Sequence, residues 1–81
     1  MKITVRLFAG AAQQAGVRTI ALDLCDGADV AAARAALLDQ VPQLKALSDV
    51  SLWASETEVL DEHALLKPDS ELAMIPPVSG G

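Results

Sequence analysis

The feature that most constrains the fold is a single long stretch with helical periodicity, set among short segments in which apolar and polar residues alternate. Between Val30 and about Gln40, apolar residues recur at spacings of three and four, and the alanines between them favour a helix. Asp29 is well placed as the N-cap, and Pro42 disfavours helical geometry at the residue before it. The chain therefore has one main helix with which to cover a sheet.

Five other segments show the alternation or the short apolar runs that are typical of half-buried strands. They are residues 2–8, 19–24, 50–54, 58–60 and 71–75. Because the stretch from Ala9 to Gly16 is small and polar, we predict that the first two strands form a hairpin with a long loop. The third and fourth strands are predicted to form a second, smaller hairpin. Together the elements predict an α+β domain in which one main helix covers one face of a mixed sheet.

The length of the chain leaves room for one hydrophobic core only. With 81 residues, of which 52% are hydrophobic, the chain is too short for two domains but has enough apolar material for one. The last predicted strand is stopped by two prolines, which cannot rejoin a sheet. We therefore expect residues 1–75 to form the domain and residues 76–81 to form a flexible tail.

Two large apolar residues are predicted to lie outside this core. If the odd-numbered residues of the first strand face the core, Phe8 lies on the opposite face of the sheet. Ile75 does the same if Leu72 and Met74 face the helix. With Val59, these residues are expected to form an apolar patch near the root of the tail that binds a partner. The alternative is that they merely cap the edge of the sheet.

Charge and length exclude several classes of protein. Six basic against eleven acidic residues give a formal charge of −5, the wrong sign for binding nucleic acid. The apolar runs are far shorter than the roughly 20 residues of a membrane span. A single cysteine cannot form an internal disulfide, and the first residues do not resemble a signal peptide, so a reducing cytoplasm is the expected location.

No residue pattern indicates a catalytic centre. There is no glycine-rich phosphate loop, and His63 has no second ligand at a spacing that suits zinc, so we predict no metal, no bound cofactor and no catalytic residue. Aspartates beside Cys25 disfavour its thiolate, and we expect an inert, packed thiol. Trp53 is expected to be partly buried on the sheet surface.

The strongest functional signal is the segment Pro76-Pro77-Val78-Ser79-Gly80-Gly81. Two prolines hold an extended path, and glycines without Cβ atoms can pass through a narrow channel. Six extended residues reach on the order of 20 Å, which is enough to enter the active site of another protein. The α-carboxylate of Gly81 is then the expected functional group.

With these motifs the chain resembles the MoaD/ThiS family of ubiquitin-like sulfur carriers, and most closely the MoaD type, the small subunits of molybdopterin synthase. The resemblance rests on the tail, on Leu66-Lys67-Pro68-Asp69-Ser70-Glu71-Leu72 before the last strand, and on the opening Val5-Arg6-Leu7-Phe8-Ala9. It spans the whole chain. It implies a ubiquitin-like β-grasp fold for residues 1–75 and the role of a carrier that is not an enzyme by itself.

The resemblance also implies a mechanism that depends on partner proteins. A ubiquitin-activating-type enzyme (MoeB type) uses ATP to adenylate Gly81, and sulfur from a cysteine desulfurase system converts it to a thiocarboxylate. The large subunit (MoaE type) then takes up the tail and holds the catalytic residues. There the sulfur passes to cyclic pyranopterin monophosphate to form the molybdopterin dithiolene. Two small and two large subunits in a heterotetramer are implied as well.

Three other functions remain open at this point. A ThiS-type carrier has the same fold and chemistry but gives its sulfur to thiazole synthesis, although the Pro76-Pro77 pair favours the molybdopterin pathway. A protein modifier would be joined through Gly81 to lysines of other proteins. A plain interaction domain would not need its last two glycines.

Overall fold

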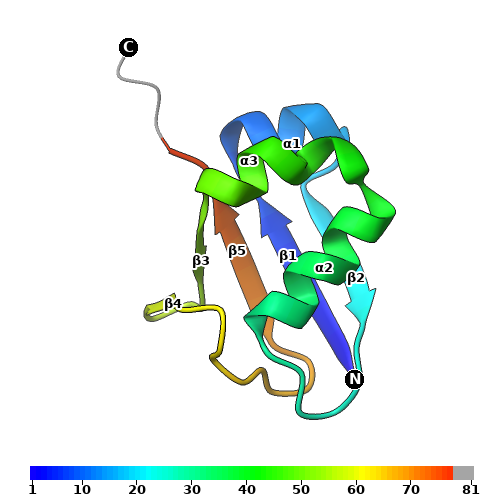
Figure 1. The fold of residues 1–81 in the computed structure, drawn as a ribbon, viewed down its shortest axis with the longest axis vertical. Helices are drawn as coiled ribbons and strands as arrows, with labels where there is room; N and C mark the ends of the chain where they lie inside the picture. Colours follow the sequence, from blue (N-terminus) through cyan, green and yellow to red (C-terminus); the bar gives the residue numbers. More distant parts are fainter. Residues whose placement is uncertain (78–81) are drawn as a thin grey trace.

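A computed structural model describes residues 1–77 of the chain, and this part forms one mixed sheet with helices against it (Figure 1). The strands are β1 (Lys2–Leu7), β2 (Thr19–Asp23), β3 (Leu52–Ala54), β4 (Val59–Leu60) and β5 (Glu71–Ile75). The helices are α1 (Ala9–Ala15), α2 (Val30–Gln40) and α3 (Lys45–Val50), with a 3₁₀ turn at Pro42–Leu44. The predicted α+β class and the single sheet are confirmed.

The sheet has the order β2-β1-β5-β3-β4, with β1 and β5 side by side at its centre. These two strands run parallel and pair Leu7 with Met74, whereas β2 and β3 flank them in antiparallel orientation. Figure 1 shows α2 lying across the sheet, with α1 and α3 gathered at the end toward which β1 and β5 point. The mixed sheet under one main helix is thus as predicted.

The core lies between the sheet and the helices, and the alternation of the strands supplies it. The odd-numbered residues of β1 are buried, and so are Leu72 and Met74 of β5, as the sequence predicts. From α2 the buried residues are Val30, Ala33 and Leu37, which recur at the predicted spacing. The Asp29 carboxylate accepts a hydrogen bond from the Ala32 amide at 2.9 Å, which confirms the predicted N-cap.

The segment between β1 and β2 is a helix, so the predicted long loop is wrong. Four of residues 9–15 are alanines, and alanine has the highest helix propensity of all residues. Gly16 ends α1 in the left-handed conformation, with φ 76°, and its amide donates to the Ala12 carbonyl. The predicted antiparallel pairing of the first two strands is confirmed.

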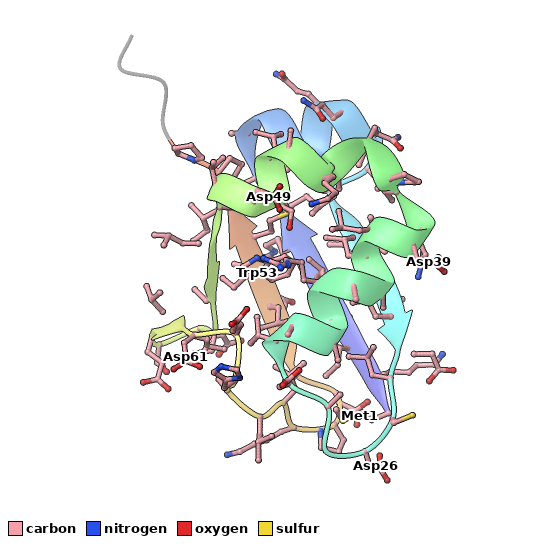
Figure 2. All side chains as sticks on the ribbon, viewed as in Figure 1. Met1, Asp26, Asp39, Asp49, Trp53 and Asp61 are labelled. Carbon is pink, nitrogen blue, oxygen red and sulfur yellow. The ribbon has the colours of Figure 1, made fainter. Side chains whose placement is uncertain are left out.

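Two further expectations around the third strand are corrected. Val50, predicted to begin that strand, is the last residue of α3, which follows the 3₁₀ turn beginning at Pro42. Proline suits this first position because an amide hydrogen there would have no acceptor within the helix. Trp53 is a core residue with 6% of its surface exposed, because β3 turns this side chain toward the helices (Figure 2).

Both edges of the sheet are short or partly covered. At one edge, β4 contains only two residues, which pair with Trp53 and Ala54 of β3. At the other edge, the side-chain amide of Gln40 donates to the Ala21 carbonyl of β2 at 3.3 Å. The Gln40 side chain, at the end of α2, therefore partly covers the edge strand β2.

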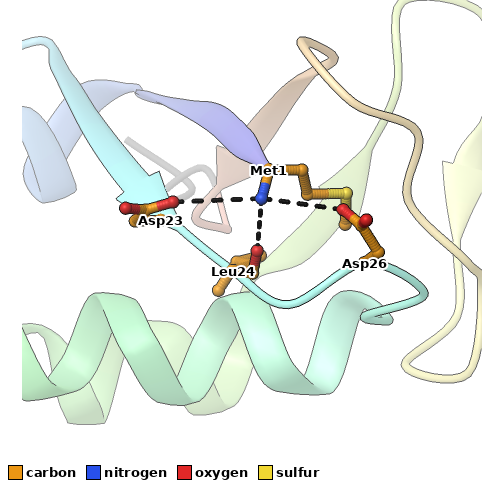
Figure 3. A network of polar contacts seen from close by, with 4 residues as sticks. All are labelled: Met1, Asp23, Leu24 and Asp26. Carbon is orange, nitrogen blue, oxygen red and sulfur yellow. Dashed lines mark hydrogen bonds and ion pairs between the residues drawn. The ribbon is translucent and has the colours of Figure 1, made fainter.

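The start of β1 is fixed to the loop that follows β2 (Figure 3). The α-amino group of Met1 donates to the Leu24 carbonyl and lies 3.9 Å from the Asp23 carboxylate and 3.8 Å from that of Asp26. Both carboxylates are almost fully exposed to solvent, so the ion pairs are screened and weak. The hydrogen bond continues the β1–β2 pairing to the first residue of the chain.

The turn before β5 contains a residue whose backbone favours glycine. Pro68 and Asp69 are the central residues of a turn that the Ser70 amide closes on the Lys67 carbonyl at 3.2 Å. Asp69 has φ 62°, as the third residue of a type II turn requires. Its own amide donates to the Lys2 carbonyl at 2.9 Å and so ties the turn to β1.

We therefore expect Asp69→Gly to raise the free energy of unfolding by about 1 kcal/mol, because glycine adopts this φ without steric cost. Denaturant unfolding followed by circular dichroism measures the change. Asp69→Ala is the control, because it removes the same carboxylate but keeps the Cβ atom. Equal stability of the two variants would show that the backbone of Asp69 is not strained.

Candidate functional site

The face of the sheet that the helices leave uncovered carries an apolar patch. In β5 the side chains alternate, so that Met74 is buried while Ile75 is 38% exposed on the opposite face. Leu52 of β3 pairs directly with Ile75, and its side chain is 56% exposed. Cross-strand partners have Cβ atoms about 5 Å apart, so Leu52 and Ile75 form one apolar surface.

Phe8 extends this surface across the centre of the sheet. It follows Leu7, which pairs with Met74, so the next residues along the two parallel strands are Phe8 and Ile75. Its side chain is 40% exposed. Val59 lies on the same face on the far side of β3, where it pairs with Ala54. Together these residues form the open-face patch: Phe8, Leu52, Val59 and Ile75.

Three of these four residues were predicted from the sequence, and the structure places them on one face. Leu52 was missed, although the alternation contains the signal. Trp53 is the largest side chain of its segment and takes the core side, which forces Leu52 to the open side. Whether the patch binds a partner remains a prediction.

The chain leaves the sheet beside this patch. Pro76 follows Ile75 directly and is buried, whereas Pro77 is exposed. The other predicted tail residues, Val78, Ser79, Gly80 and Gly81, lie outside the described residues. The predicted boundary between domain and tail therefore stays a prediction, and so does the role of Gly81.

A polar rim borders the patch along β1 and β5. The Arg6 guanidinium lies 3.4 Å from the Glu71 carboxylate, and both side chains are substantially exposed. Such a pair adds little stability because solvent screens it. An apolar centre with a polar border is typical of surfaces that bind other proteins.

Metal-ligating side chains are not clustered in residues 1–77. These residues contain no group of three or more His, Cys, Asp or Glu side chains that could hold a metal ion. His63 is exposed, and its Nε2 atom lies 3.6 Å from the carboxylate of Glu62. Cys25 is exposed as well, which corrects the expectation of a packed thiol. None of the helices in this part of the chain is long and apolar enough to cross a bilayer.

Comparisons with known proteins extend over the whole chain. A model of the ThiS family matches residues 5–81. The molybdopterin synthase sulfur carrier subunit of Arabidopsis thaliana is 31% identical over 81 residues, which are 100% of this chain and 84% of that protein. The family model and this relative therefore both span nearly the whole chain.

Two solved structures show the same fold. The crystal structure of SAMP1 (small archaeal modifier protein 1) from Haloferax volcanii superimposes with a TM-score of 0.92 at 30% identity, covering 100% of both chains. A complex of subunits 1 and 2 of the molybdopterin-converting factor from Helicobacter pylori contains a chain with a TM-score of 0.72 at 24% identity, again with 100% of both chains covered. At that lower identity the likeness concerns the fold alone.

The exposure of the patch can be tested by comparing a Leu→Ala substitution in the patch with one in the core. We expect Leu52→Ala to cost less than about 1 kcal/mol of unfolding free energy, because Leu52 is mostly exposed. Leu72→Ala should cost about 2–5 kcal/mol, because Leu72 is buried in the core. Urea unfolding measures both. Similar losses in the two variants would mean that Leu52 belongs to the core and not to a free surface.

Proposed function

The chain belongs to the ThiS family, and on that basis we propose that it is the sulfur-carrier subunit of a molybdopterin synthase. The observation that carries the proposal is the full-length similarity to the sulfur carrier subunit of Arabidopsis thaliana. The Gly80-Gly81 motif supports it, since a carrier of this kind needs an unhindered α-carboxylate at its end.

In this proposal, Gly81 is the only residue of the chain that takes part in covalent chemistry. A carboxylate is a poor electrophile, so an activating enzyme of the MoeB type uses ATP to convert it to an acyl adenylate. The terminal sulfur of a persulfide from a cysteine desulfurase system displaces AMP and forms an acyl disulfide. A thiol then reduces this disulfide, which releases the thiocarboxylate and leaves the thiol in a disulfide of its own. The carrier binds no cofactor in this scheme, and ATP belongs to the activating enzyme.

The remaining chemistry takes place in a partner. A large subunit of the MoaE type receives the tail, from Pro76 to Gly81, and supplies the catalytic groups that transfer sulfur to cyclic pyranopterin monophosphate. The carrier supplies the covalently bound sulfur atom, and the docking of its open-face patch positions the tail in the partner. In the Helicobacter pylori complex a chain with the same fold is joined to a second subunit. For the present chain we propose an assembly with two copies of each subunit.

Removal of Gly81 tests the carrier chemistry directly. We expect the shortened chain to lose molybdopterin formation completely, because the carboxylate of Gly80 does not reach the position of the reacting group. Its thermal melt should be unchanged, since residues 1–77 contain the whole described fold. Product formed by the shortened chain would contradict the proposal.

The sulfur-loaded carrier can be detected directly. Mass spectrometry of the intact protein should show that one oxygen of Gly81 is replaced by sulfur.

A charge in the open-face patch tests the docking. We expect Phe8→Asp to abolish binding to the large subunit in calorimetry while the melting temperature stays close to that of the wild type. Leu65→Asp is the matched control, since Leu65 is also an exposed apolar residue but precedes the turn that leads into β5, at the opposite end of that strand from Ile75. Unchanged affinity of Phe8→Asp would remove the patch from the interface.

A protein modifier is the second candidate, and the similarity to SAMP1 favours it specifically. A modifier would form an isopeptide bond between Gly81 and lysines of other proteins. Conjugates of the chain that survive denaturation would support this function, whereas a free or thiocarboxylated carrier would support the first.

A ThiS-type carrier differs from both in its partner, a thiazole synthase in place of the large subunit.

A further inference from the structure

A hollow with two arginines lies beside the open-face patch. It has a volume of about 470 Å³ and lies where β1 ends, α1 begins and β2 starts. Its lining consists of Arg6, Leu7, Phe8, Ala9, Ala12, Arg18 and Thr19. Neither the proposed carrier chemistry nor the described core uses the two guanidinium groups. Phe8 is shared with the open-face patch, so the two surfaces are continuous.

The hollow is a local concentration of positive charge in an acidic chain. The whole protein has a formal charge of −5, yet two of its six basic residues line this one surface. Glu71 partly neutralises Arg6 at 3.4 Å. Within residues 1–77, no carboxylate lies within 4 Å of the Arg18 guanidinium, so its charge is left for another molecule.

The sheet register places this charge close to the start of the tail. The Leu7 amide donates to the Arg18 carbonyl at 2.7 Å, and Leu7 pairs with Met74 on its other side. Arg18 is therefore separated from the end of β5 by two strand spacings, about 10 Å. Because Phe8 belongs to both surfaces, a protein that covers the open-face patch lies next to this hollow.

We propose that the hollow binds an acidic segment of the partner that receives the tail, with a carboxylate of that segment paired to Arg18. This inference rests on the proposed function and names a further determinant of its docking site. A guanidinium offers a fork of donors that matches a carboxylate, which lysine does not. Because the rest of the carrier is acidic, the hollow fixes the orientation in which an acidic partner surface can approach.

The test measures the affinity of the full-length carrier for the purified large subunit by calorimetry, at low and at high salt. Arg18→Glu should weaken binding at low salt by at least about tenfold, and the loss should shrink at high salt because ions screen the repulsion. Arg34→Glu is the control with the same change of net charge, since Arg34 lies on α2 over the opposite face of the sheet. It should bind within about twofold of the wild type.

Arg18→Lys separates the fork of donors from the charge alone. We expect it to recover part of the affinity lost in Arg18→Glu, and all variants should melt like the wild type. Equal losses for Arg18→Glu and Arg34→Glu, or a loss that does not depend on salt, would overturn the inference while leaving the carrier function intact. Failure of the wild-type carrier itself to bind the large subunit would overturn the proposed function and the inference with it.

Discussion

The parallel pairing of β1 with β5 is the constraint on which the rest of the molecule depends. Parallel neighbours cannot be joined by a tight turn, so the chain between them must cross over, and α2 forms the part of this crossover that covers the sheet. Adjacent parallel strands also have their carboxyl ends at the same end of the sheet. Phe8 and Ile75, at positions far apart in the sequence, thereby become neighbours at the place where the chain leaves the domain.

Local patterns predicted the parts of the fold that depend on local physics. The alternation in β1 and β5 assigned the correct face to each side chain, and Asp29 marked the start of α2. The segment 9–15 was misread as a loop because its small residues carry no apolar period, whereas their helix propensity is high. The strand order depends on which strands pair, and no local pattern records this.

The candidate site was predictable to the same extent and for the same reasons. Phe8, Val59 and Ile75 follow from the phase of their strands, so the patch could be expected before its geometry was known. The Arg6–Arg18 hollow could not, because the two arginines become neighbours only through the β1–β2 register. Surfaces of this kind are what the proposed carrier function requires of the folded part of the chain.

The two edges of the sheet have a consequence for self-association. A long, unpaired edge strand is a template for aggregation, because its free backbone groups can add strands from other chains. Here β4 is only two residues long, and the Gln40 side chain occupies a carbonyl of β2. The β4 edge therefore offers little backbone for strand addition, and at the β2 edge one acceptor is already engaged. The apolar open face then stays available to a different protein chain.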